Sequence, residues 1–148
     1  MRKLYITRKD SLAGCFKKLH IYISDFENSE LDICDIPCRK IGEIKNGESV
    51  ALEINNDANR IFVTAGKKTR NLCCDSVHIE KGNKEIKLTG KCKFNPSRLN
   101  AFNFDGEPDE MAKRYRENGN RNGSLLLAGI AVVIAAVAVA VCSLPILG

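Results

Sequence analysis

The sequence predicts an all-β domain, a seven-stranded immunoglobulin-like antiparallel β-sandwich, followed by a flexible linker and one transmembrane α-helix. Three observations predict it. Seven short stretches alternate apolar and polar residues, turn residues separate them, and the 23 residues from Leu125 to Leu147 carry no charge. A period of two is typical of strands with one buried face, and about 20 apolar residues suffice for a helix to cross a bilayer. The 148 residues therefore divide into a sandwich (1–104), a polar linker (105–123) and a transmembrane helix (124–147).

Each of the seven stretches has one apolar and one polar face, which favours antiparallel sheets packed face to face. Gly42 interrupts the third stretch and predicts a β-bulge there. The acidic segment from Phe26 to Pro37 is expected to be a surface loop. The stretches are 3–7, 19–24, 38–44, 49–54, 61–65, 76–80 and 85–89.

Two turn sequences predict hairpins. Asn46-Gly47 lies between the third and fourth stretches and is a strong signal for a two-residue turn. Gly82-Asn83 lies between the sixth and seventh, where a two-residue turn would set Ile79 opposite Ile86. About seven strands in a domain of roughly 100 residues are typical of an immunoglobulin-like sandwich.

The alternation also predicts which polar and aromatic side chains face outward. We expect both histidines on the polar faces, without the pocket and orienting group that a catalytic pair needs. Outward aromatic residues would mark a binding face if they cluster. The expected outward residues are His20, His78, Tyr5, Tyr22 and Phe62.

The membrane signal lies near the C-terminus. Four basic residues precede the apolar run, Lys113, Arg114, Arg116 and Arg121, whereas the N-terminal residues lack the apolar segment of a signal peptide. The Lys/Arg bias predicts a single-pass, tail-anchored protein with its N-terminal domain in the cytoplasm. Ala131 and Ala135 lie four residues apart, a spacing that favours a homodimer through the transmembrane helix.

Seven cysteines leave alternatives open. In the cytoplasm they are expected to be reduced thiols. A zinc site or a redox pair would use Cys34, Cys38, Cys73 and Cys74, since zinc thiolates usually come in closely spaced pairs. If the domain were exported instead, six of the cysteines could form three disulfides.

Several functions are excluded by the pattern. The net charge is +5, but the basic residues are scattered, so no nucleic-acid surface is expected. No nucleophile elbow, phosphate-binding loop or zinc-protease helix occurs, which argues against an enzyme and against catalytic residues or a bound cofactor.

The order of features resembles the PEGA-like β-sandwich domains of bacterial membrane-associated proteins. A basic strand (residues 3–8) and the stretch 20–23 are followed by residues 40–48, which contain Asn46-Gly47-Glu48, and then by 50–54 and 60–63. Asn56-Asp57-Ala58 stands where Pro-Glu-Gly is expected. The resemblance implies a non-enzymatic accessory or interaction domain.

The sequence thus predicts a tail-anchored β-sandwich that binds another protein at the membrane surface. The alternatives are a thiol- or zinc-dependent sensor and an exported, disulfide-stapled surface domain.

Overall fold

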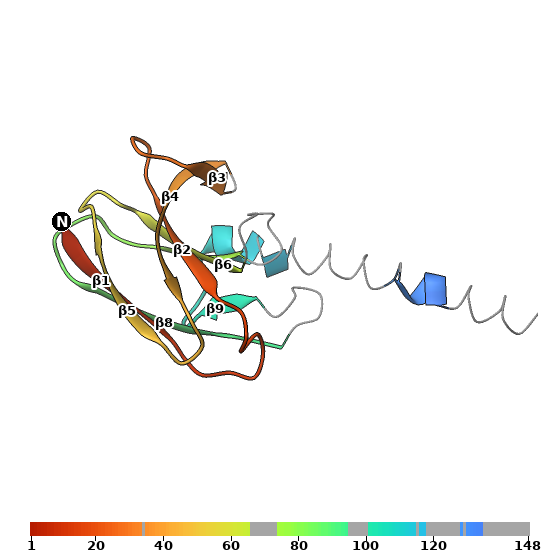
Figure 1. Cartoon of the computed structure of the whole chain (residues 1–148). Coiled ribbons are helices and arrows are strands. Elements are labelled where there is room, and N and C mark those ends of the chain that lie inside the picture. The colour runs from red at the N-terminus through yellow and green to blue at the C-terminus, as the bar shows by residue number, and fades with distance from the viewer. Residues whose placement is uncertain are drawn as a thin grey trace, which may run out of the picture.

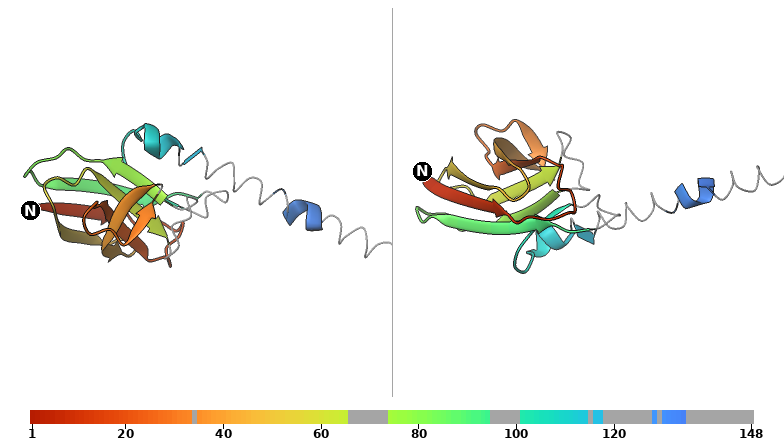
Figure 2. Two further views of the ribbon diagram at one scale, coloured as in Figure 1. Left: turned by 90° about the horizontal axis from the view of Figure 1, so that it is seen from above. Right: turned by 60° about the horizontal axis from the view of Figure 1, so that its bottom comes forward.

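A computed structural model describes residues 1–33, 35–65, 74–94, 101–114, 116–117, 128 and 130–134. The described strands form two sheets that face each other (Figures 1 and 2). The first sheet has the order β5 (Ser49–Ile54), β1 (Arg2–Arg8), β8 (Ile86–Cys92) and β9 (Phe102–Phe104). The second has the order β3 (Leu31–Ile33), β4 (Ile36–Ile44), β2 (Leu19–Ser24), β6 (Arg60–Ala65) and β7 (Cys74–His78).

The strand positions largely follow the sequence pattern. Each of the seven expected stretches overlaps one strand, and the described residues add β3 and β9, so the count of seven is too low. The expected bulge is confirmed, since the β2–β4 register shifts where Gly42 faces Ile21. The sheets are not purely antiparallel, because β1 and β8 run parallel, with Leu4 opposite Ile86.

The two predicted hairpins are wrong. Asn46-Gly47 joins β4 to β5, and Gly82-Asn83 lies between β7 and β8, yet each of these strand pairs belongs to two different sheets. β5 bonds to β1 instead, with Ile6 opposite Val50. Gly47 has the positive φ of a tight turn, 72°. A turn residue specifies that the chain reverses, but the reversed strand can bond to its predecessor or cross to the facing sheet.

The core lies between the two sheets. β1 contributes Leu4 and Ile6, and β2 contributes Leu19, Ile21 and Ile23, all buried. The remaining buried members come from β4, β5, β6, β8, β9 and the connections: Ile44, Ile54, Ala58, Ile61, Val63, Ile79, Cys92, Phe102 and Phe104.

Two arginines close the core at the ends of β1. Arg2 and Arg8 share the inward face with Leu4 and Ile6, and both are buried. Arg2 donates to the carbonyls of Glu80 (2.6 Å) and Ala58 (2.9 Å). Their aliphatic stems cover the core while each guanidinium binds chain carbonyls at one end of the sandwich.

A second apolar cluster lies on the outer face of the five-stranded sheet. Tyr22 and Phe62 are buried there together with Ile33 and Cys38. The expectation that Tyr22 and Phe62 face solvent is therefore wrong. The segment predicted as a surface loop contains β3 and the start of β4, and its residues Leu31, Ile33 and Ile36 pack in this cluster.

His20 points away from the core as expected but is buried, whereas His78 is exposed. β2 is buried at every position because strands flank it on both sides and both of its faces are covered.

The predicted transmembrane segment lies mostly outside the described residues. Its described positions, 128 and 130–134, are helical and exposed. Within the described part of the chain, no helix combines the length and apolar character needed to cross a bilayer.

Replacing Phe62 tests the second cluster. Phe62→Ala should lower the free energy of unfolding by about 3–5 kcal/mol, because it empties a fully buried site. Tyr5→Ala is the matched control, since Tyr5 is only half-buried, and it should cost about 1 kcal/mol. Urea unfolding of the chain in detergent micelles, followed by circular dichroism, measures both. Equal losses would contradict the covered face.

Candidate functional site

The candidate site is a set of ion pairs and hydrogen bonds that fixes a short helix to the edge of the five-stranded sheet. Residues 110–114 and 116–117 are helical and follow β9; we call them the clamp helix. The Asp109 Oδ1 atom accepts a hydrogen bond from the Ala112 N–H (2.8 Å), the usual geometry of an aspartate N-cap. Ala112 is fully buried, so the first turn of the helix packs on the domain.

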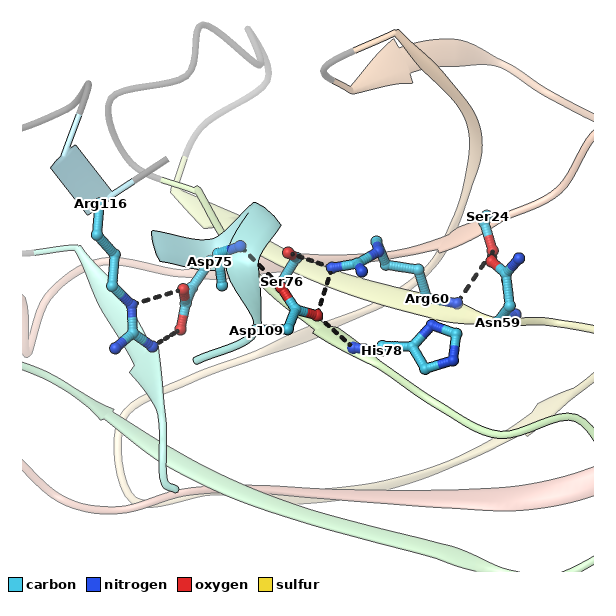
Figure 3. A network of polar contacts seen from close by, with 9 residues as sticks. Ser24, Asn59, Arg60, Asp75, Ser76, His78, Asp109 and Arg116 are labelled. Carbon is cyan, nitrogen blue, oxygen red and sulfur yellow. Dashed lines mark hydrogen bonds and ion pairs between the residues drawn. The ribbon is translucent and has the colours of Figure 1, made fainter. Parts of the chain in front are cut away.

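Asp109 also ties the start of the clamp helix to β6 and β7 (Figure 3). Its Oδ2 atom lies 2.9 Å from an Arg60 guanidinium nitrogen and accepts the backbone N–H of His78 (3.2 Å). The same guanidinium donates to the Ser76 hydroxyl (3.0 Å). Since Arg60 is only 11 % exposed, the ion pair is partly desolvated and specifies one position for Asp109.

Asp75 holds the other end of the clamp helix. Its carboxylate pairs with the Arg116 guanidinium through two parallel contacts, Nε–Oδ1 of 3.0 Å and Nη2–Oδ2 of 2.7 Å. The backbone N–H of Phe104 donates to the same carboxylate (2.7 Å). Asp75 is fully buried, so this one side chain joins β7, β9 and the clamp helix.

These contacts set the direction of the clamp helix. Asp109 lies beside His78 at the end of β7, and Arg116 reaches Asp75 near its start, so the helix runs antiparallel to β7. β7 starts at the end of the sandwich where β6 ends and β2 begins. The clamp helix therefore ends at this end of the sandwich, which we call the exit end. Besides the end of the clamp helix, the exit end comprises the loop 9–18, the turn 45–48 and residues 91–94.

The clamp keeps Asp109 ionised to lower pH than usual. Burial raises the pKa of the Asp109 carboxyl, but the Ala112 N–H, the Arg60 guanidinium and the His78 N–H outweigh it. The net result is a lowered pKa.

Two of the four candidate cysteine ligands lie within the described residues. Cys38 is buried in the second cluster, where its thiol donates to the Ile36 carbonyl, and Cys74 begins β7. Cys34 and Cys73 lie outside the described residues. Among the described residues, no group of three or more His, Cys, Asp or Glu could hold a metal ion.

The predicted membrane-flanking residues divide into two kinds. Lys113 and Arg114 are exposed on the clamp helix, whereas Arg116 turns inward to Asp75. Arg121 lies outside the described residues. The sequence alone cannot separate these roles, because a basic residue before an apolar run serves equally as a lipid contact or as an ion-pair partner.

A second polar cluster surrounds Glu43 on β4. Lys18 and Lys40 form ion pairs with its carboxylate, and these contacts lower the pKa of Glu43 to about 2. His20 lies 3.2 Å from the same carboxylate. Burial, with help from Lys40, nevertheless lowers the pKa of His20, which favours neutral imidazole. The cluster consists of two lysines and one glutamate around a buried ring.

Sequence reasoning missed Arg60 and Asp75 as members of the site. One signal was present: aspartate is depleted in strands, so an aspartate inside a strand pattern indicates a specific partner. The partner itself, Arg116, is 41 residues away and could not be inferred.

Loss of Arg116 should destabilise the domain. Arg116→Ala removes the guanidinium from the buried Asp75 carboxylate and should lower the free energy of unfolding by about 2–4 kcal/mol. Arg114→Ala, two residues away and exposed, should change it by less than about 0.5 kcal/mol. Urea unfolding in micelles measures both, and a similar small effect of the two substitutions would show that the clamp contributes nothing.

The Asp109 charge should give the clamp a defined pH dependence. Because the folded-state pKa is lowered, its stabilisation is full above the ordinary aspartate pKa and is lost as the pH falls through the folded value. Asp109→Asn keeps an N-cap but removes the charge. The difference in unfolding free energy between the natural chain and this variant should be constant from about pH 7 to 5 and shrink below that range. A difference that persists unchanged in acid would exclude the charge as its source.

Comparison with known proteins adds two distant similarities. No family model matches the sequence, and no curated protein matches it. Among solved structures, the chain is similar to the C-terminal domain of the type VI secretion protein TssM from EAEC. The two sequences are 15 % identical, the match covers 70 % of this chain and 99 % of that chain, and the TM-score is 0.40. It is also similar to Serratia marcescens Lip, a membrane-bound component of the type VI secretion system, with 12 % identity, coverage of 73 % and 97 %, and a TM-score of 0.37. The resemblance to PEGA-like domains stays a prediction.

Proposed function

We propose that this protein is a non-enzymatic interaction module, held at a membrane surface by a single C-terminal transmembrane helix over residues 124–147. The clamp supports this proposal most directly. Two ion pairs, Asp109–Arg60 and Arg116–Asp75, hold both ends of the segment that leads toward the apolar run. A module on a loose tether would need no such attachment, whereas a module presented in one orientation does.

The clamp shortens the tether. Residues 118–124 separate the clamp helix from the apolar run, and seven residues extend at most about 25 Å. A domain attached this way stays close to the bilayer and meets a partner in the same membrane at high effective concentration. We place the N-terminal domain in the cytoplasm, as the Lys/Arg bias favours.

The partner is a protein, and β5 is the strand best suited to bind it. β5 is the outer strand of its sheet, with Ser49, Ala51 and Glu53 exposed along it. Among the described residues no strand pairs with its outer edge, which can accept an extended segment by strand addition. The β7 edge is less suitable, because the clamp helix is fixed beside it.

Membrane attachment is tested by fractionation. The full chain should stay in the membrane pellet after alkaline carbonate extraction, because the apolar run inserts as a helix. A chain ending at residue 124 should be released, and this truncation is the matched control. Release of the full chain would refute the anchor.

Labelling of Cys15 with a membrane-impermeant maleimide then tests the orientation, since Cys15 is half-exposed and forms no disulfide. A cytoplasmic domain should be labelled only in permeabilised cells. Labelling in intact cells would invert the proposed topology.

A further inference from the structure

Three of the largest exposed apolar side chains of the sandwich gather at the exit end. Leu12 is 95 % exposed, Phe16 fully exposed and Phe94 79 % exposed. Single exposed apolar residues are ordinary. Three large ones at the end toward which the clamp helix runs are not explained by the packing of the domain.

The loop that carries Leu12 and Phe16 is held in place by a buried arginine. The Arg8 guanidinium donates to the carbonyls of Lys17 (2.6 Å) and Gly14 (2.7 Å). Gly14 adopts a positive φ of 67°, which allows the tight reversal between the two apolar side chains. Their exposure is therefore built into the loop.

Two hydrogen bonds tie the end of β8, just before Phe94, to this loop. The Ser11 hydroxyl donates to the carbonyl of Cys92 (2.7 Å), two residues before Phe94, and the Lys9 N–H donates to the Gly90 carbonyl (2.8 Å). The loop 9–18 and the end of β8 thus form one continuous surface.

The charges around this surface are mostly positive. Its lysines are Lys9, Lys17, Lys18, Lys45, Lys91 and Lys93, against the acids Asp10, Glu43, Glu48 and Asp105. Asp105 pairs with Lys9 and Glu43 with Lys18, whereas Asp10 and Glu48 accept hydrogen bonds from neutral donors, the Asn46 amide and the Lys45 backbone N–H. The lysines of this surface therefore exceed its acids by six to four. Lys45, Lys91 and Lys93 are exposed.

We infer that the exit end rests on an anionic lipid surface, with Leu12, Phe16 and Phe94 inserted at the level of the headgroups. Apolar side chains surrounded by lysines are typical of surfaces that insert shallowly into such membranes. This inference rests on the proposed membrane anchor and adds to it which end of the domain faces the bilayer. The clamp supports it, because the clamp helix also ends at the exit end.

Tryptophan fluorescence can test this, because the chain contains no Trp. Phe16→Trp and Phe94→Trp place a single reporter on the proposed surface of the full chain. Phe26→Trp is the matched control, since Phe26 is 73 % exposed but follows β2 at the opposite end of the sandwich. Each variant is reconstituted into vesicles of phosphatidylserine and brominated phosphatidylcholine, whose bromine atoms quench tryptophan in the membrane.

We expect the Phe16→Trp and Phe94→Trp variants to lose most of their emission and to shift to shorter wavelength. The Phe26→Trp variant should keep the emission of a water-exposed reporter. Adding Lys91→Glu and Lys93→Glu to the Phe16→Trp variant should reduce quenching in anionic vesicles, because these substitutions reverse two charges at the surface.

Vesicle flotation separates the two proposals. A chain that does not float with vesicles refutes the anchor, and the docking that rests on it falls as well. A chain that floats while Phe16→Trp is quenched no more than Phe26→Trp refutes the docking alone. Equal quenching with and without phosphatidylserine overturns the requirement for anionic lipid.

Discussion

The sandwich depends on the two arginines that β1 places in its interior. β1 bonds to β5 on one side and to β8 on the other, and its inward face reads Arg2, Leu4, Ile6, Arg8. A buried guanidinium is costly unless its donors are hydrogen-bonded, and here chain carbonyls accept from the terminal Nη1 and Nη2 atoms of both arginines. The cost is offset only when the connections at both ends of the sandwich present carbonyls to these positions. The same contacts that satisfy the arginines therefore shape the ends of the domain, including the loop with Leu12 and Phe16.

The clamp applies the same chemistry to the edge of the other sheet. Asp75 is fully buried, and its retention depends on Arg116 and on the Phe104 N–H. Removing one partner of a buried charged pair is strongly destabilising, whereas replacing both partners by apolar residues of similar volume is often neutral. Such a pair therefore contributes more to selecting one arrangement than to the net stability of the fold. That property suits a segment whose role is to lead the chain out in a defined direction. In the proposed arrangement the exit end faces the bilayer, because the clamp helix ends there, and β5 lies at the outer edge of the other sheet.

Local pattern located the strands but not their partners. Alternation marked seven of the strands, and Gly42 marked the bulge. β3 and β9 have only three residues each, too few for alternation to show. The hairpin predictions at Asn46-Gly47 and Gly82-Asn83 are wrong because turn chemistry acts over a few residues, whereas the choice between bonding and crossing depends on the facing sheet. The parallel pair β1–β8 brings together residues about 80 positions apart, and no local signal reports it.

By itself, the sequence determined the strand positions, the charge-free run from Leu125 to Leu147 and the basic residues before that run, because each is a property of consecutive residues. Only the tertiary structure decided which faces are covered. Tyr22, Phe62 and His20 lie at positions that alternate with core residues, yet all three are buried. Period-two alternation distinguishes two faces of a strand, but it cannot say whether another segment covers the second one. Arg116 illustrates the same limit, since its partner Asp75 comes from a distant strand and depends on the assembled sheets.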